Sequence, residues 1–406
     1  MTPRGRMRRF LNGEQVDRIP NGLGGCETAS LHSVAYHRLK NVLDVDDPTN
    51  RVCTFMTNAV FEPSVLDAME GDIILLGSGM CPSRFWGPDA AHEWRPLRIW
   101  DVELQVANAW EFRRDPDGTW WWGNRMCPPG GLYFDPPDGQ HVAKSFEDTP
   151  APSPDDFNPS HDLPESLLDR LAEDAEWLHE NTDYCIACGE IAGGLQCQPG
   201  GTQAWWMRMV SEPEACHEFL DKAVDATLAR LRQLDDAVGA YCDIAGIADD
   251  MGDTRGITIG PELWQQIYKP HYRRLFTEWH KITDMKINLH TCGATIDILD
   301  DLIECGVDIY NPVQVSANGM EPTGLKERFG DRLIFYGGGF DAVQLPATTS
   351  PDVVYETVRA NITALSRNGG YIFAGVHNLP GDMPEAHLGA MLQAYRDCRD
   401  DLVCRP

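Results

Sequence analysis

Short apolar runs alternate with longer helical patterns along the chain from about residue 184 to its end. The stretches between the runs, such as 261–282 and 350–369, begin at Ser or Pro and stop near Gly or Asn, as helices do. Strands separated by helices predict a parallel sheet, and this many βα units favour a (β/α)8 TIM-type barrel. The apolar runs are YCDIAGIA (241–248), MKINLH (285–290), VDIYNP (307–312), RLIFYGGG (332–339) and GYIFAG (370–375).

An open, doubly wound sheet is the alternative fold for such an alternation. No G-x-G-x-x-G fingerprint follows any early strand, which favours the barrel over the open sheet. The 406 residues exceed the usual length of one domain, but α/β barrels often exceed that length as single units. We therefore expect one barrel domain over residues 1–406.

Residues 84–150 carry a different pattern. This stretch holds seven tryptophans, among them Trp120, Trp121 and Trp122 in a row, and turn signals such as DPDG, CPPGG and DPPDG. Alternating aromatic and polar residues between turns predict short antiparallel strands. We interpret the stretch as an insertion within the barrel domain. Packing, a dimer contact or a lid over the barrel mouth are its alternative roles.

Charge and cysteine content restrict the partners and the compartment. A formal charge of −28 argues against a basic surface for nucleic acid, and no run of about 18 apolar residues predicts a transmembrane helix. The basic start MTPRGRMRRF lacks the apolar region of a signal peptide. Thirteen scattered cysteines suit a reducing compartment. We expect a cytoplasmic protein that binds neither nucleic acid nor membranes.

Unusual polar residues follow successive predicted strands. Barrel enzymes carry their chemistry at the carboxyl ends of the strands, so this shared position is a stronger signal than any single motif. Asp249 and Asp250 provide either a general acid, a carboxylate ligand or a turn into the next helix. The full set is Asp249, Asp250, His290, Cys292, Asn311, Gln314, the glycines 337–339, His377 and Asn378.

His290 and Cys292 form an H-x-C pair after one of these strands. Residues i and i+2 of an extended segment point the same way, so both side chains can reach one ion. Thiolate and imidazole together suit zinc, which takes about three protein ligands in catalytic sites. By itself the pair also fits an incidental or buried pair. His377 is the best-placed third ligand, and the alternatives are Asp249, Asp250 and Cys305, the last at the wrong end of the barrel.

A second thiol motif, C-x-x-C, is formed by Cys185 and Cys188. On a strand, residues i and i+3 face opposite sides, so the two thiols cannot hold one metal without a turn between them. We interpret the motif as part of a buried strand.

Five segments match one known family. They are MTPRGRMRRFLNGEQVDRIP (1–20), DDMGDTRGITIGPELWQQIYKPHYRRL (249–275), INLHTCGATIDILDDLIECGVDIYNPVQ (287–314), LKERFGDRLIFYGGGFDAVQLP (325–346) and GGYIFAGVHNLPGDMPEAHL (369–388). On these segments the chain resembles the uroporphyrinogen decarboxylase superfamily, specifically its zinc- and corrinoid-associated methyltransferase branch. The resemblance implies a (β/α)8 barrel, a cleft at its carboxyl face and a homodimer.

The sequence departs from this superfamily at two places. Uroporphyrinogen decarboxylases hold substrate carboxylates with an early Arg-x-x-x-Arg segment, and residues 22–30 (GLGGCETAS) contain no arginine. The methyltransferase branch holds zinc with a His-x-Cys pair and a later cysteine in an A-P-G-C segment. His290 and Cys292 match the pair, but the later segment reads A-G-V-H and ends in His377.

A site with two neutral histidines and one thiolate leaves about one positive charge on zinc, which favours Lewis acidity toward oxygen or nitrogen. The resemblance therefore implies a zinc-dependent methyltransferase or demethylase that moves a methyl group between a small O- or N-methylated substrate and a corrinoid. No D-x-H-x-x-G corrinoid signature is present, so the corrinoid belongs to a partner protein. Asp250 or Asp249 would act as the acid. The expected substrate-binding residues are Asn311, Gln314, Gly338 and Asn378.

Two other functions fit the same barrel. One is a decarboxylase or lyase that acts on a small carboxylated substrate, and the other is a non-catalytic barrel that binds a small ligand. Zinc that is lost on substitution of His290 or Cys292 favours the methyltransferase, whereas metal-free consumption of a carboxylated substrate favours the decarboxylase.

Overall fold

The computed structural model describes residues 1–54, 56–77, 83–137, 162–189, 194–195 and 201–400. Seven parallel strands form one sheet in the order β1–β7–β8–β9–β10–β11–β12. The strands are β1 (Ile73–Leu75), β7 (Cys185–Cys188), β8 (Ile244–Ala248), β9 (Lys286–His290), β10 (Ile309–Asn311), β11 (Ile334–Tyr336) and β12 (Tyr371–Ile372). Each of the five predicted runs from 241 to 375 contains one of these strands.

A short extended segment near the N-terminus closes the sheet. Asn21 forms a parallel bridge with Phe373, just beyond β12. On its other side, the N–H of Asp72, just before β1, donates to the carbonyl of Asn21 (2.8 Å). This segment takes the eighth position between β12 and β1. The predicted (β/α)8 TIM-type barrel is therefore confirmed, and the open doubly wound sheet is excluded.

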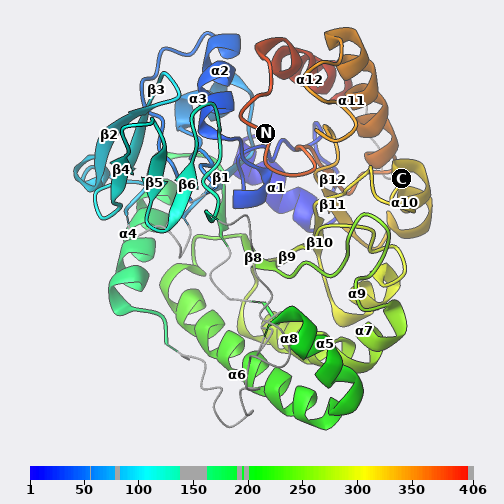
Figure 1. Ribbon diagram of the computed structural model, residues 1–406. Helices are drawn as coiled ribbons and strands as arrows, with labels where there is room; N and C mark the ends of the chain where they lie inside the picture. The colour runs from blue at the N-terminus through cyan, green and yellow to red at the C-terminus, as the bar shows by residue number, and fades with distance from the viewer. Residues whose placement is uncertain (55, 78–82, 138–161, 190–193, 196–200, 401–406) are drawn as a thin grey trace.

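Helices cover the outside of the barrel (Figure 1). The predicted helix over 261–282 is divided at Tyr268 into α7 and α8, because Pro270 lacks the N–H that a continuous helix would use. The helices are α1 (Pro3–Leu11), α2 (Ser33–Leu43), α3 (Pro63–Ala68), α4 (Glu165–Asn181), α5 (Thr202–Ser211), α6 (Pro213–Val238), α7 (Pro261–Ile267), α8 (Lys269–Ile282), α9 (Leu299–Cys305), α10 (Pro322–Phe329), α11 (Pro351–Leu365) and α12 (Glu385–Cys398), with short 3-10 turns η1 (Glu27–Ala29) and η2 (Ala90–Glu93). Among the described residues, no helix combines the length and the apolar character that crossing a bilayer requires.

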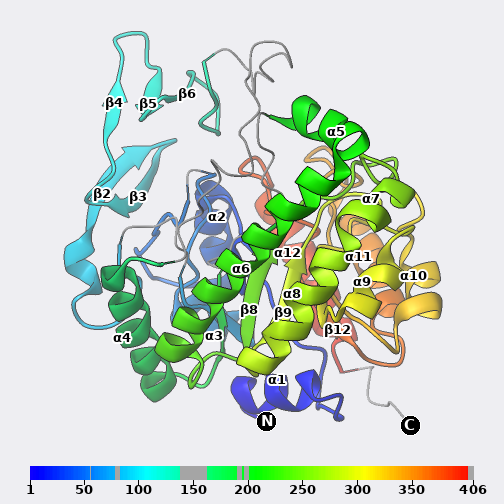
Figure 2. The same cartoon turned by 90° about the horizontal axis from the view of Figure 1, so that it is seen from below.

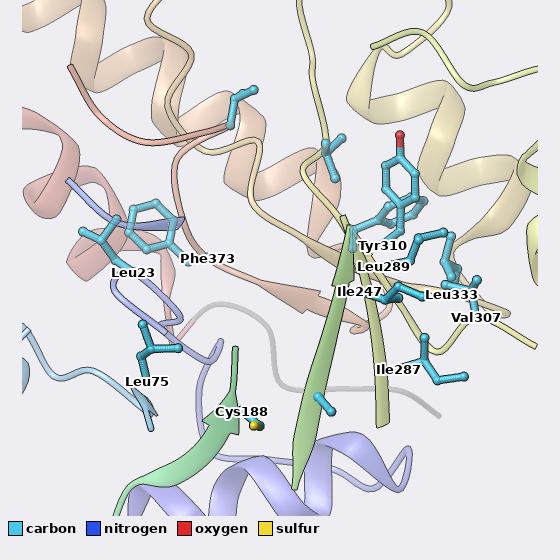
Figure 3. Packing of buried hydrophobic residues seen from close by; sticks show 14 of the residues in the cluster. Leu23, Leu75, Cys188, Ile247, Ile287, Leu289, Val307, Tyr310, Leu333 and Phe373 are labelled. Atoms are coloured by element: carbon cyan, nitrogen blue, oxygen red, sulfur yellow. The ribbon is translucent and has the colours of Figure 1, made fainter. Parts of the chain in front are cut away.

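Alternate residues of each strand face two different layers. Ile287 and Leu289 of β9 belong to the large apolar layer between the strands and the helices, part of which Figure 3 shows. Ile244 of β8 and Ile309 of β10 belong instead to a smaller cluster inside the barrel. Side chains of opposite parity on one strand therefore have different surroundings, and the parity decides which polar residues face the barrel interior.

Helix α1 (Pro3–Leu11) lies across the amino ends of the strands (Figure 2). Its Met7 side chain joins the interior cluster. Asp72, which is fully buried, binds Arg6 of this helix (2.5 Å) and Arg18 (2.7 Å). The helix and this ion network close the amino end of the barrel. A site that is open to a substrate is therefore expected at the carboxyl end.

The C-x-x-C motif forms β7, in which all four residues are buried. Cys185 belongs to the interior cluster and Cys188 to the outer layer, so the two thiols face opposite sides of the sheet. The prediction of a buried strand is confirmed.

The Trp-rich stretch forms two antiparallel sheets between β1 and β7, as predicted. Its strands are β2 (Trp94–Ile99), β3 (Val102–Ala107), β4 (Phe112–Arg114), β5 (Trp120–Trp122) and β6 (Arg125–Cys127). Trp120 and Trp122 pack in an aromatic cluster with Phe112 and Phe134, while Trp121 points to the other face and donates to Asp115 (2.7 Å). Positions 138–150 of the predicted insertion 84–150 lie outside the described residues.

Candidate metal centre

Three ligand-type side chains meet at the carboxyl end of the barrel. His290 is the last residue of β9, Cys292 follows two positions later, and His377 lies in the loop after β12. One ligand atom from each lies within 4.8 Å of the others. The Cys292 Sγ is 3.5 Å from the His290 Nε2, and the two imidazole centroids are 5.3 Å apart. The structure thus brings together the three residues that the sequence assigned to zinc.

Asn311 fixes the orientation of His290. The His290 Nδ1 lies 2.9 Å from the Asn311 Oδ1, an acceptor, so Nδ1 carries the hydrogen and the Nε2 lone pair faces Cys292. The same Oδ1 accepts from the Thr28 hydroxyl (2.9 Å), and the Asn311 Nδ2 donates to the carbonyl of Tyr336 (3.2 Å). Asn311 is fully buried and engaged on both sides of its amide. Such partners of a ligand histidine set its tautomer and its direction.

Burial keeps both imidazoles in the form that binds metal. It lowers the pKa of His290, despite the hydrogen bond to Asn311. It also lowers the pKa of His377, with a further contribution from the neighbouring His290, to about 4. Both rings are therefore neutral near pH 7, and a metal ion need not displace a proton from either.

The donor set fits zinc. Two imidazole nitrogens and one thiol sulfur are zinc ligands, and three protein ligands with a further position open are typical of catalytic zinc. The sulfur disfavours Mg²⁺ and Ca²⁺, which prefer oxygen. Among the described cysteines, Cys292 alone is not fully buried. Cys305 ends α9 and contacts the carbonyl of Lys269, so it takes no part in the group.

Strand parity separates the two aspartates that follow β8. Asp250 is an even number of positions after Ile244 and so points to the same side, the barrel interior. Its carboxylate lies 3.7 Å from the His290 Nε2 and accepts the Cys292 N–H (3.0 Å). Asp249 has the outward parity, is 3 % exposed and accepts from the Tyr272 hydroxyl (2.5 Å) and the Leu195 N–H (2.7 Å). Asp250 therefore faces the three ligands. Asp249 instead links Leu195 to Tyr272 of α8.

Gln314 holds the loop that carries Cys292. Its Oε1 accepts the N–H of Gly293 (2.8 Å). Gly293 has φ +96°, and a Cβ there would lie 2.5 Å from the backbone carbon of Gly252, so only glycine fits this approach of two loops.

The two remaining residues of the predicted substrate set hold neighbouring loops together. Gly338 packs against Val313 and donates to the carbonyl of Gly375 (3.3 Å). The Asn378 Oδ1 accepts the Ser30 N–H (3.3 Å).

Sequence reasoning missed Thr28 and Tyr272. Thr28 reaches Asn311 from 283 positions away, and Tyr272 reaches Asp249 from α8. No local pattern marks Thr28. Tyr272 could have been found, because it lies on the buried face of the amphipathic helix α8.

Comparisons with known proteins agree with this fold. Residues 197–398 match the family model described as uroporphyrinogen decarboxylase (URO-D). The chain is similar in structure to a methyltransferase from Methanosarcina mazei, with a TM-score of 0.53 and 15% identity over 98% of this chain and 99% of that one. At this identity the likeness shows the fold alone.

Two xylanases are more weakly similar to this chain in structure. Xylanase B from Clostridium stercorarium F9 aligns at a TM-score of 0.36 and 13% identity over 59% of this chain and 86% of that one. An endo-1,4-beta-xylanase from Penicillium canescens aligns at 0.35 and 10% over 64% and 87%. No curated protein matches the sequence.

The matched part of the chain contains all three candidate ligands as well as Asp250 and Asn311. It also contains the strands from β8 to β12, which bring those residues to the carboxyl end. The resemblance found in the sequence is thereby confirmed for residues 197–398, about half of the chain, which match the uroporphyrinogen decarboxylase family model.

Proposed function

We propose that this protein is a zinc-dependent methyltransferase or demethylase. It moves a methyl group between a small O- or N-methylated substrate and a corrinoid carried by a partner protein. The group of His290, Cys292 and His377 beside the carboxylate of Asp250 carries this proposal. The family match and the fold shared with a methyltransferase support it. A cytoplasmic homodimer is the expected setting.

His290, Cys292 and His377 are the residues that would hold zinc. When bound, zinc supplies Lewis acidity toward a substrate oxygen or nitrogen. Two neutral imidazoles and one thiolate leave the site about one positive charge, which suits a neutral oxygen or nitrogen donor. Asn311 keeps the His290 Nε2 directed at the site.

Asp250 is suited to move a proton at this site. Its side chain is 63% exposed and next to the ligands, so it can exchange protons with water and reach a bound substrate. It gives a proton to the alkoxide, phenoxide or amine that remains after demethylation, or takes one in the reverse direction. Gln314 and Asn378 lie in the loops next to the ligands and are the candidates to bind the rest of the substrate.

Metal content tests the proposal most directly. The purified protein should hold about one zinc ion per chain, because three ligands converge on one point. Cys292→Ala and His377→Ala should lose it. Cys305→Ala and His280→Ala remove the same side-chain types elsewhere and should keep it. Full zinc occupancy in His377→Ala would show that the three-ligand site is wrong.

Turnover separates the methyltransferase from the decarboxylase. The zinc-loaded protein should methylate free, reduced cobalamin with at least one member of a panel of methoxy and N-methyl compounds. Metal-free protein that consumes a carboxylated substrate, with no methyl transfer by the loaded protein, would favour the decarboxylase. Ligand binding without turnover in either assay would favour a binding protein.

A further inference from the structure

The loop that carries His377 is held at Gly381 by residues from two other parts of the chain. This loop runs from β12 to α12, and its Gly381 lies four positions after His377. The Gly381 N–H donates to the hydroxyl of Tyr133 (3.1 Å), and its carbonyl accepts from the Arg38 guanidinium (2.8 Å). A Cβ at Gly381 would lie 2.7 Å from the His32 Nδ1. The loop therefore packs against His32 with no space to spare.

His32 joins this loop to the antiparallel insertion. Its Nε2 lies 2.7 Å from the carbonyl of Leu132, and its Nδ1 accepts the Val34 N–H (3.2 Å). Its backbone N–H donates to the carbonyl of Leu379 (2.9 Å). Both ring nitrogens are engaged and the residue is 1% exposed, so the ring has one fixed position between the loop and the insertion.

The tip of the β2–β3 hairpin packs against the His32 ring. Trp100 and Asp101 form the two-residue turn and have φ +55° and +59°. Such a turn favours Asn and Gly, and a bulky residue there is strained. The Trp100 ring lies 5.0 Å from that of His32 and donates to the carbonyl of Gly131 (2.7 Å). A tryptophan in this position adds nothing to the turn itself, but it supports His32.

We propose that the insertion is a clamp that fixes the third metal ligand. Trp100 supports His32, and His32 together with Tyr133 holds the loop at Gly381, so that His377 stays in reach of His290 and Cys292. Trp100, His32 and Tyr133 are positioning residues, since none of them belongs to the ligand group. The part of this inference that concerns zinc rests on the proposed function, whereas the part that concerns the loop does not.

Two substitutions test the clamp without removing the fold. Tyr133→Phe keeps the ring and deletes only the hydroxyl. Trp100→Asn deletes the ring and gives the turn a residue that tolerates its left-handed backbone, so the turn itself is not strained. Tyr355→Phe is the matched control, because the Tyr355 hydroxyl also makes one hydrogen bond, to Asp397 on α12 (2.9 Å). Hydrogen exchange of residues 374–383 in the metal-free protein and zinc affinity by chelator competition are the two measurements.

Both clamp variants should exchange faster over 374–383, and the control should not. Zinc should bind roughly three- to tenfold more weakly in Tyr133→Phe, as the loss of one hydrogen bond predicts. Unchanged exchange in both variants would overturn the clamp. Faster exchange with unchanged zinc affinity would overturn the positioning of His377. Faster exchange in a protein that binds no zinc, wild type included, would refute the proposed function and leave the clamp standing.

Discussion

At the scale of single residues, the candidate centre depends on groups that do not touch the metal position. Asn311 is the clearest case, because one oxygen accepts from both Thr28 and His290. Without it the imidazole could rotate or change tautomer, and the Nε2 would no longer face Cys292.

Asn311→Leu should weaken zinc binding about 10- to 100-fold, the usual effect of losing such a partner. It leaves the Thr28 hydroxyl and the His290 Nδ1–H without their acceptor. Asn311→Asp keeps the acceptor oxygen but loses the donor to the carbonyl of Tyr336, so it should restore only part of the affinity. Chelator competition measures both variants, and equal affinity in the leucine variant and the wild type would contradict the assigned role.

The two aspartates after β8 should behave oppositely. Asp250→Asn keeps an acceptor for the Cys292 N–H, so thermal stability should hold while turnover falls about 10²- to 10⁴-fold. Asp249→Ala should instead lower the free energy of unfolding by about 1–3 kcal/mol, because the buried Tyr272 hydroxyl loses its acceptor. Thermal melts and methyl-transfer rates of the two variants distinguish the roles, and the reverse pattern would refute the parity argument.

At the scale of secondary-structure elements, α1 contributes through the ion network around Asp72. Asp72→Ala removes the buried carboxylate that Arg6 and Arg18 share and should cost about 3–5 kcal/mol of stability. Asp17→Ala also removes a partner of Arg6, but Asp17 is 38% exposed, so about 0–1 kcal/mol is expected. Urea denaturation gives both values, and similar losses in the two variants would be inconsistent with a buried network.

Helix α4 is joined to the start of the insertion by a carboxylate with a raised pKa. The Asp174 Oδ2 accepts the N–H groups of Phe85 (2.9 Å) and Trp86 (3.0 Å), and burial raises the pKa of Asp174 from 3.8 to about 6. Between about pH 4 and pH 6 the folded state therefore binds more protons than the unfolded state.

Stability should accordingly fall as the pH rises from about 4 to about 6, as the folded state gives up that proton. Asp174→Asn keeps the acceptor and cannot ionise, so its melting temperature should fall less across the same window. Melting curves at several pH values test this, and parallel pH profiles would show that Asp174 does not titrate there.

At the scale of the whole molecule, the candidate centre ties together loops from strands that are not neighbours in the sheet. The ligands come from the end of β9, the loop that follows it and the loop after β12, so zinc would stabilise only the closed barrel. Zinc at about 100 times its dissociation constant should add about 2.7 kcal/mol to the free energy of unfolding. Removing it with a chelator should lower the melting temperature of the wild type. Cys292→Ala should show no such change, and an equal decrease there would place the metal elsewhere.

Local sequence patterns were sufficient for much of the fold. The alternation of apolar runs with helical stretches predicted the barrel, and each predicted run from 241 to 375 contains a strand. The two-residue period of a strand predicted that His290 and Cys292 point the same way and that Cys185 and Cys188 do not. It also separates Asp250 from Asp249, although the sequence reasoning kept both as candidates. The split at Tyr268 was missed, despite Pro270.

What the sequence determined by itself was periodic: the strands, the helices, the antiparallel segment and the shared direction of His290 and Cys292. Periodicity depends on backbone geometry, which acts over a few residues. The tertiary structure alone decided which distant groups meet. It placed His377 beside His290, linked Thr28 to Asn311, closed the barrel through Asn21 and set Tyr133 against the loop of His377. These contacts join residues that lie far apart in the chain. A pattern over a few residues does not show which distant residues will meet.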